Sequence, residues 1–196
     1  MTSLRLRNRQ RVRDEIIEAA YAVFAERGYA EATVADITER AGVGRTTFFR
    51  YFGDKQEVLF AGEQLWLDDI RRRLEQSVPE GPRTLPQALG LLRDITAGLC
   101  TAATRDPGRY VLRRRLIAEN PELGDREARK HRLLVELLSE ALQRRGAPAE
   151  TAALAPRLAL ACYQAGGELA GDDPAALWPH VAAAFDRLES IGRAAG

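Results

Sequence analysis

The chain has 196 residues, 45% of them hydrophobic and 29% charged, and carries a formal net charge of +1 at pH 7. This length and composition suit a folded protein of one large or two small domains and exclude an intrinsically disordered chain. No apolar run reaches the roughly 20 residues that span a membrane, and the N-terminus lacks the hydrophobic stretch of a signal peptide. We therefore expect a cytoplasmic protein without a membrane partner.

Histidine and cysteine, which build many catalytic and metal sites, are scarce. Cys100 and Cys162 lie far apart and belong to no CxxC pair, so we expect buried free thiols rather than a zinc site or a disulfide. His131 and His180 are the only histidines, and no HExxH, GxSxG, GxxxxGK or GxGxxG motif is present. We therefore expect no catalytic residue, no enzyme activity, no metal site and no cofactor.

The N-terminal segment is strongly basic. Five arginines precede the first acidic residue, Asp14: Arg5, Arg7, Arg9, Arg11 and Arg13. Arginines clustered at an N-terminus can bind DNA phosphates or enter the minor groove, and the other interpretation is a solvated, disordered tail. The motif that follows favours the first interpretation, so we expect a DNA-contacting basic arm over residues 1–13.

The next segment carries the most informative pattern in the chain. Thr33 and Asp36 form a capping box, followed by apolar residues at spacings of 3 and 4, which predicts a helix that begins at Val34. Gly42 supplies the left-handed conformation that ends such a helix, and Gly44 can serve as the N-cap of the next. This short turn between two short helices is typical of a helix-turn-helix.

The second helix of the pair is predicted over residues 45–51. Its inner face would bury Phe48 and Phe52, and its outer side would present hydrogen-bond donors: Arg45, Thr46, Thr47 and Arg50. A further capping box at residues 54–57 predicts that the next helix begins near Lys55. Donors on the outer side of a short helix are suited to reading the edges of DNA bases.

Several segments occur here in a fixed order: an amphipathic leading helix ending at Phe24-Ala25-Glu26-Arg27-Gly28-Tyr29, then Thr33-Val34-Ala35-Asp36-Ile37, Ala41-Gly42-Val43, Thr47-Phe48-Phe49-Arg50-Tyr51-Phe52 and Lys55. In this succession, about residues 10–60 resemble the DNA-binding domain of TetR/AcrR-type transcriptional regulators. The resemblance implies a DNA-binding homodimer with an effector pocket in its second domain. It also implies a repressor, because that role is usual in the family.

The resemblance also implies which residues contact DNA. Arg45 and Thr46 are the leading candidates for base edges, and the full expected set is Thr33, Arg45, Thr46, Thr47, Phe49, Arg50, Tyr51 and Lys55. Among these, Thr33, Thr47, Tyr51 and Lys55 are expected to hold phosphates. The sequence departs from the family pattern at Gly44, where Ser is often found, and at Phe49, where Tyr is common. These departures remove a hydroxyl cap and a phenolic phosphate contact.

The rest of the chain shows helical spacing interrupted by proline, glycine and capping residues. A linker rich in proline and glycine is expected over residues 78–86. The predicted helices beyond the front module run over about residues 55–77, 89–103, 109–118, 121–146, 148–170 and 174–191. Gly166 and Gly167 could bend the helix that begins after Pro148.

The last two helices are candidates for a dimer interface. The helix after Pro148 is apolar on more than one side, and a stripe on the final helix comprises Leu177, Val181, Ala184, Phe185 and Leu188. A helix that is apolar on two sides needs two partners. We favour a four-helix interface between two subunits over an ordinary core within one chain, because a helix-turn-helix reader obtains its half-site spacing from two-fold symmetry.

The middle of the second domain is expected to hold the effector. The weak candidates for pocket lining are Trp66, Leu99, Cys100, Tyr110 and Tyr163, and each of them is also a plausible core residue. The phenylalanine-rich motif at residues 48–52 resembles a subgroup of the family associated with acyl-CoA-like effectors. Arg113, Arg114 and Arg115 would then meet a phosphate, or else form a solvated face.

We therefore predict an all-α protein of nine helices and two domains. The predicted DNA-binding helix-turn-helix domain covers residues 1–56, and an effector-binding and dimerisation domain covers residues 57–196. The predicted function is ligand-responsive regulation of transcription on a palindromic double-stranded DNA operator. The alternative is a helical adaptor or ligand-binding protein of the same fold that has lost specific DNA binding.

Overall fold

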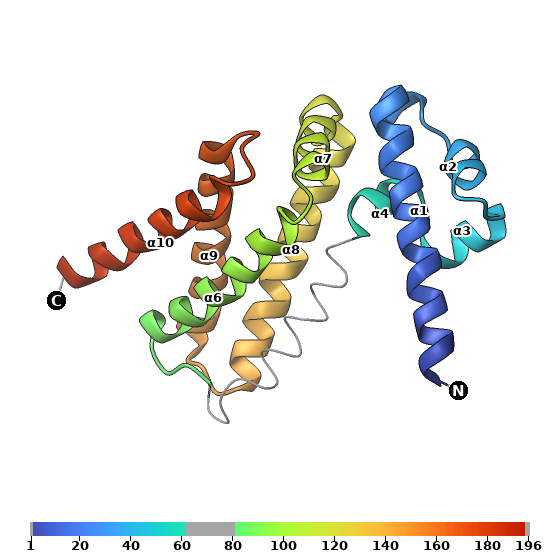
Figure 1. Cartoon of the computed structure of the whole chain (residues 1–196). Helices are drawn as coiled ribbons and strands as arrows, with labels where there is room; N and C mark the ends of the chain where they lie inside the picture. Colours follow the sequence, from blue (N-terminus) through green and yellow to red (C-terminus); the bar gives the residue numbers. More distant parts are fainter. Residues whose placement is uncertain (1, 62–80, 195–196) are drawn as a thin grey trace. The chain divides into compact units, whose positions relative to one another are not determined.

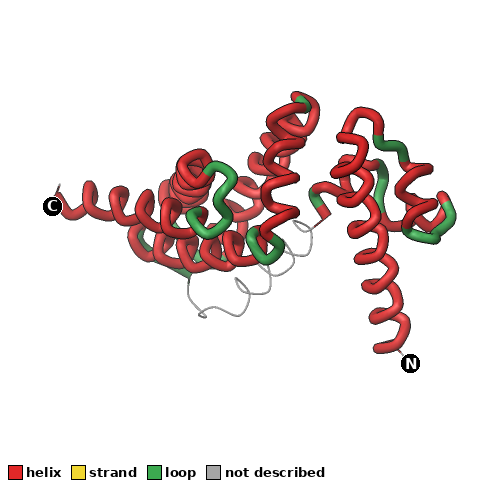
Figure 2. The backbone as a smooth tube through the Cα atoms, turned by 45° about the horizontal axis from the view of Figure 1, so that its top comes forward, coloured by secondary structure: helices red, strands yellow, loops and turns green. Residues whose placement is uncertain are grey.

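The computed structural model describes residues 2–61 and 81–194, and the side chains of residues 7–61 and 81–190. These described residues form nine α-helices and no strand, which confirms the predicted all-α architecture and its helix count. Figures 1 and 2 show the helical course of the backbone. Over the same residues, no helix combines the length and hydropathy needed to cross a membrane.

The chain divides into two compact units, and the division falls within two helices. Unit 1 contains the described residues up to position 61 together with Leu112–Gly124. Unit 2 contains the described residues of 81–111 and of 125–194. The expected domain boundary after residue 56 falls inside unit 1, because Val58, Leu59 and Phe60 are buried in the same cluster as the helix-turn-helix core.

Unit 1 is built around α1 (Thr2–Glu31), with α2 (Val34–Arg40), α3 (Arg45–Tyr51) and α4 (Lys55–Leu59) packed beside it (Figure 1). The unit also takes in the end of α7 (Pro107–Glu119) and the start of α8 (Pro121–Arg144). Its core residues come from all six helices and include Ile16, Phe24, Ile37, Phe48, Val58, Leu116 and Leu123. Each such fully buried side chain stabilises the fold by about 1.5–3 kcal/mol.

Local contacts fix the helix-turn-helix. The capping box between Thr33 and Asp36 is present, and Gly42 ends the first helix with a φ of 64°, as predicted. Gly44 is the N-cap of α3 and makes no side-chain bond there. Glycine at this position costs only a few tenths of a kcal/mol relative to a hydroxyl cap, so α3 forms without one.

The start of α4 differs in one detail from the predicted capping box. Asp54 accepts a hydrogen bond from the Glu57 amide at 2.7 Å, as expected. The Glu57 carboxylate, however, accepts from the amide of Gly53 at 2.6 Å, one residue before the N-cap. The predicted helix is therefore found from Lys55, but α4 ends at Leu59 with Phe60 as its C-cap, so it is not the single helix expected up to residue 77. Residues 62–77 of that expected span lie outside the described residues.

Unit 2 contains α6 (Leu85–Ala103), α9 (Ala149–Ala170) and α10 (Leu177–Ala194), with the start of α7 and most of α8. Helix α6 begins earlier than predicted, inside the expected linker. Thr84 and Gln87 form a capping box, and Pro86 occupies the first turn, where a missing amide hydrogen costs nothing. Pro86 thus lies in the first turn of a helix, and residues 78–80 of the expected linker lie outside the described residues.

Helices α9 and α10 pack closely through Gly166. A β-carbon added there would lie 2.4 Å from Cγ2 of Val181 and 2.5 Å from its backbone nitrogen. The glycine that was expected to bend α9 therefore permits the close approach of α10 instead. In the same core, Cys100 and Cys162 are buried free thiols, as predicted, and burial raises the pKa of Cys100 to about 12.

Candidate nucleic-acid interface

Helix α3 turns two aromatic rings inward and its polar residues outward. Phe48 and Phe52 are buried, whereas four residues are exposed: Arg45, Thr46, Phe49 and Arg50. Thr47 and Tyr51 are partly exposed. Six of the eight residues predicted to contact DNA thus share one short helix with a buried anchoring face.

Two guanidinium groups lie over the ring of Tyr51 at the end of α3. The guanidinium carbon of Arg50 lies 5.4 Å from the centre of the Tyr51 ring, and that of Arg9, on α1, lies 6.0 Å from it. These three residues and Asn8 line an open surface hollow. Two guanidinium groups over one tyrosine ring offer hydrogen-bond donors and positive charge that suit a phosphate group. The sequence included Arg9 in the basic arm but gave no indication that it approaches Tyr51.

The basic N-terminal segment is helical. Residues 2–13 form the first turns of α1 and are therefore not a disordered tail, and the contact of this basic arm with DNA stays a prediction. Its arginines have different surroundings. Arg11 lies 3.5 Å from the Glu15 carboxylate. Arg13 turns inward, where it donates to the Ala61 carbonyl and lies 5.6 Å from the Phe52 ring. Burial lowers the pKa of Arg13. This arginine is therefore part of the fold of unit 1.

Lys55 binds the end of α1. Its ammonium nitrogen donates to the carbonyl oxygens of Tyr29 at 2.7 Å, Ala32 at 2.8 Å and Ala30 at 3.2 Å. It also lies 4.3 Å from the centre of the Tyr29 ring. Burial lowers the pKa of Lys55, an effect that the charges of Glu122 and Glu31 partly oppose. Because an ammonium group has three donors, this arrangement occupies all of them.

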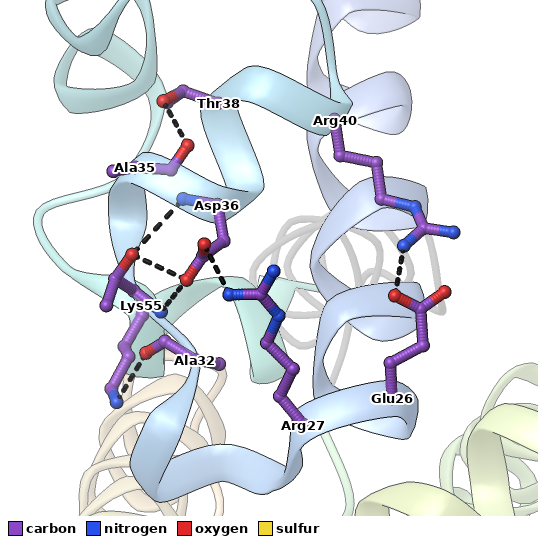
Figure 3. Close-up of polar contacts among 9 residues, drawn as sticks. Glu26, Arg27, Ala32, Ala35, Asp36, Thr38, Arg40 and Lys55 are labelled. Carbon is purple, nitrogen blue, oxygen red and sulfur yellow. Dashed lines mark hydrogen bonds and ion pairs between the residues drawn. The ribbon is translucent and has the colours of Figure 1, made fainter.

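Thr33 donates both of its hydrogen bonds to a residue of the same unit. Its hydroxyl donates to the Asp36 carboxylate at 2.6 Å, and its amide donates to the same oxygen at 2.9 Å. These bonds, with a smaller contribution from Arg27 at 2.7 Å, lower the pKa of Asp36. Figure 3 shows a second ion pair between α1 and α2, in which Arg40 lies 2.6 Å from Glu26. The phosphate roles of Thr33 and Lys55 stay predictions.

The residues predicted to line an effector pocket have different environments. Cys100 and Tyr110 lie in the core of unit 2, and the Tyr110 hydroxyl donates to the Gly171 carbonyl at 3.2 Å. Leu99 and Tyr163 are partly buried. Trp66 lies outside the described residues. Of these, Tyr163 makes an edge-to-face contact with His131 at 6.1 Å between ring centres.

Comparison with known proteins agrees with this arrangement. A sequence model of the family described as "Bacterial regulatory proteins, tetR family" matches residues 16–61, which contain α2, α3 and α4. An uncharacterized HTH-type transcriptional regulator of Mycobacterium tuberculosis is 36% identical over 106 residues, which cover 49% of this chain and 53% of that protein. Residues 16–61 thus match the DNA-binding domain of the TetR family, and the matching relatives support a TetR-type transcriptional regulator. The chain spans about half the length of this curated relative.

Solved structures of other proteins share the fold over nearly the whole chain. SmeT, the repressor of a multidrug efflux pump of Stenotrophomonas maltophilia, has a TM-score of 0.60 at 22% identity, covering 91% of this chain and 89% of that one. FadR of Thermus thermophilus, a TetR-family repressor in complex with lauroyl-CoA, has a TM-score of 0.55 at 22% identity, covering 89% and 91%. At this identity the likeness shows the fold alone.

Proposed function

We propose that this TetR-family chain is a DNA-binding transcriptional regulator that reads a palindromic operator as a homodimer. The observation that carries the proposal is the outward face of α3, where exposed Arg45, Thr46 and Arg50 stand on a helix anchored by the buried Phe48. A helix of this kind fits the major groove, and arginine is suited to bidentate contact with guanine. Arg45 is our main candidate for base recognition, with Thr46 beside it.

Phosphate contacts are assigned to the edge of the same surface. Arg9, Arg50 and Tyr51 supply two guanidinium groups and a hydroxyl within one cluster, and Thr47 adds a second hydroxyl on α3. Such contacts fix the register of a protein on DNA without reading its sequence. Lys55 and Thr33 stabilise the unit that carries this surface, since Lys55 joins α4 to the segment at the end of α1 and Thr33 caps α2.

The homodimer is supported by the surface of α9. Leu154 and Leu169 are 46% and 61% exposed, and Ala161 and Ala165 are exposed between them at helical spacing. The stripe on α10, in contrast, is used within the chain, because Leu177, Val181 and Phe185 are buried in the core of unit 2. An exposed apolar stripe on a helix of a soluble domain is a protein-contact surface, and a second copy of the chain is the occupant we propose.

Release by a small-molecule effector is the regulatory part of the proposal. Lys55 fixes the first turn of α4 to the end of α1, so displacement of α4 would carry α1 with it. An effector that prefers one dimer shape would then change the separation of the two recognition helices. A repressor is the role carried by the similar SmeT and FadR.

The class of effector is the last part of the proposal. An acyl-CoA-like molecule agrees with the similar FadR–lauroyl-CoA complex, whereas a similar SmeT complex holds triclosan. The arginines expected to meet a phosphate have contacts within the chain, since Arg113 lies 5.0 Å from the Phe60 ring and Arg115 lies 4.0 Å from Glu119. Mass spectrometry of ligand that copurifies with the chain would identify the class.

An electrophoretic shift on DNA flanking the chain's own coding sequence tests the DNA-binding function. Binding should be sensitive to salt, and Arg45→Ala should relax the preference at one or two base pairs at a cost of about 1–3 kcal/mol. Uniform loss of affinity across sequences would instead make Arg45 a phosphate contact. If neither this DNA nor a random-sequence pool yields salt-sensitive binding, the chain is the adaptor of the alternative prediction.

A further inference from the structure

Phe49 is an apolar side chain on a surface that otherwise offers hydrogen-bond donors. It is 49% exposed, and it lies on α3 three and four residues after the exposed Thr46 and Arg45. Residues at these spacings are neighbours on a helix surface. An apolar ring of this size gains free energy when another apolar group covers it. The surroundings of Phe49 therefore indicate a partner that is polar overall and apolar at one point.

The direction of the Phe49 ring is fixed by the core. Its centre lies 5.4 Å from that of Phe48, and the two ring planes meet at 86°. Phe48 is fully buried and lies 5.8 Å from Phe52, ring centre to ring centre. An edge-to-face contact with a buried ring holds the exposed one in a defined orientation. The exposed Phe49 ring is thus held by contact with Phe48, the buried ring that anchors α3.

We propose that Phe49 reads the 5-methyl group of a thymine in each operator half-site. The inference rests on the proposed function, in which α3 enters the major groove. The edges of all base pairs in that groove carry hydrogen-bonding groups, and the thymine methyl is the apolar group among them. Because phenylalanine has no hydroxyl to donate to a phosphate, apolar contact is the chemistry that it brings to DNA.

Deoxyuridine provides the test, because it differs from thymidine only by the methyl group. Duplexes are first selected from a random-sequence pool with the full-length chain. Each thymine of the enriched site is then replaced by deoxyuridine, in one half-site or in both. For the wild type, one thymine position should be sensitive, with affinity falling about fourfold for one half-site and about 15-fold for both.

Phe49→Ala shows whether Phe49 is the reader. This variant should bind the thymine duplex about as weakly as the wild type binds the deoxyuridine duplex. When thymine is replaced by deoxyuridine, the affinity of the variant should change less than about twofold. Phe49→Leu keeps an apolar side chain and should retain part of the methyl sensitivity. Circular dichroism checks the fold of both variants, and Phe49→Leu alone serves for the comparison if Phe49→Ala unfolds.

The outcomes separate this inference from the proposed function. If the wild type binds the selected duplex but no thymine is sensitive, or Phe49→Ala keeps the full sensitivity, the methyl contact is overturned and DNA binding stands. If Phe49→Tyr tightens binding to every duplex alike, including those with deoxyuridine, the new hydroxyl reaches a phosphate, which also overturns it. If no duplex is enriched, the proposed function fails and the inference falls with it.

Discussion

The ammonium nitrogen of Lys55 lies 2.8 Å from the carbonyl oxygen of Ala32 and contacts two other carbonyls at the end of α1. Carbonyls at the end of a helix have no partner within it, so a cation there supplies both hydrogen bonds and favourable charge. Lys55 therefore joins the first turn of α4 to α1, although its position in the sequence pattern indicated a phosphate contact. The two roles make different predictions.

We predict that Lys55→Met acts mainly on stability. Methionine keeps the apolar stem but leaves the carbonyl oxygens without the ammonium donor, so the free energy of unfolding should fall by about 1–3 kcal/mol in urea titrations. The slope of log affinity against log salt should stay unchanged. Arg50→Ala is the comparison, since loss of a phosphate contact lowers that slope by about 0.9 per subunit. A lower salt slope for Lys55→Met would instead show that Lys55 contacts a phosphate.

The capping box of α2 should make stability depend on pH in the acid range. Hydrogen bonds from Thr33 and the charge of Arg27 lower the folded-state pKa of Asp36 below its ordinary 3.8. The ionised Asp36 therefore contributes fully to the stability of the fold above pH 3.8, and this contribution is lost as the pH falls through the lowered pKa of the folded state. Asp36→Asn should flatten this part of the profile in thermal unfolding. Glu39→Gln, on the exposed side of the same helix, is the matched control and should leave the profile as it is.

Gly166→Ala should destabilise the packing of α9 on α10. The new methyl would lie 2.4 Å from Val181, with backbone atoms nearly as close, so the helices must separate at a cost of about 1–3 kcal/mol or more. Gly98→Ala on α6 is the matched control. Nothing lies within 4 Å of its added β-carbon, and alanine there should raise stability by about 0.5–1 kcal/mol. Equal effects of the two changes would contradict the close approach.

Leu169→Glu should convert the chain into a monomer that remains folded. Leu169 is 61% exposed on α9, so the substitution leaves the core intact and places a charge in the proposed dimer surface. Sedimentation velocity measures the change. Leu133→Glu is the control, because Leu133 on α8 is 59% exposed and lies outside that surface. The α9 assignment is wrong if Leu169→Glu stays dimeric, or if only Leu133→Glu dissociates.

Local sequence patterns were enough to predict α3 and the cap, turn and buried ring that hold it in place. The capping box at Thr33, the left-handed Gly42 and the buried Phe48 all depend on residues within a few positions of one another. The partners of Lys55 lie 23 to 26 residues away, and Arg13 reaches a carbonyl 48 residues away. Such contacts follow from how helices pack, which no short pattern specifies. For the same reason, the sequence did not predict that Arg9 lies near Tyr51 or that Gly166 permits close helix packing.

The effector residues stay predictions, for a different physical reason. Apolar residues at helical spacing serve equally well as core or as pocket lining, so the sequence cannot separate the two uses. Cys100 and Tyr110 proved to be buried in the core of unit 2. The outward residues of α3 were easier to predict, because the helical spacing that buries Phe48 also places Arg45 and Arg50 on the exposed side.

Sequence discrimination on DNA tests the central claim most directly. Fluorescence anisotropy would compare the full-length chain on a duplex enriched from a random pool and on a shuffled duplex of the same base composition, at one fixed salt concentration. A regulator that reads DNA through α3 should bind the enriched duplex at least about 1,000-fold more tightly, and Arg45→Ala should narrow that ratio. Equal affinity for the two duplexes, or no binding to either, would contradict the claim.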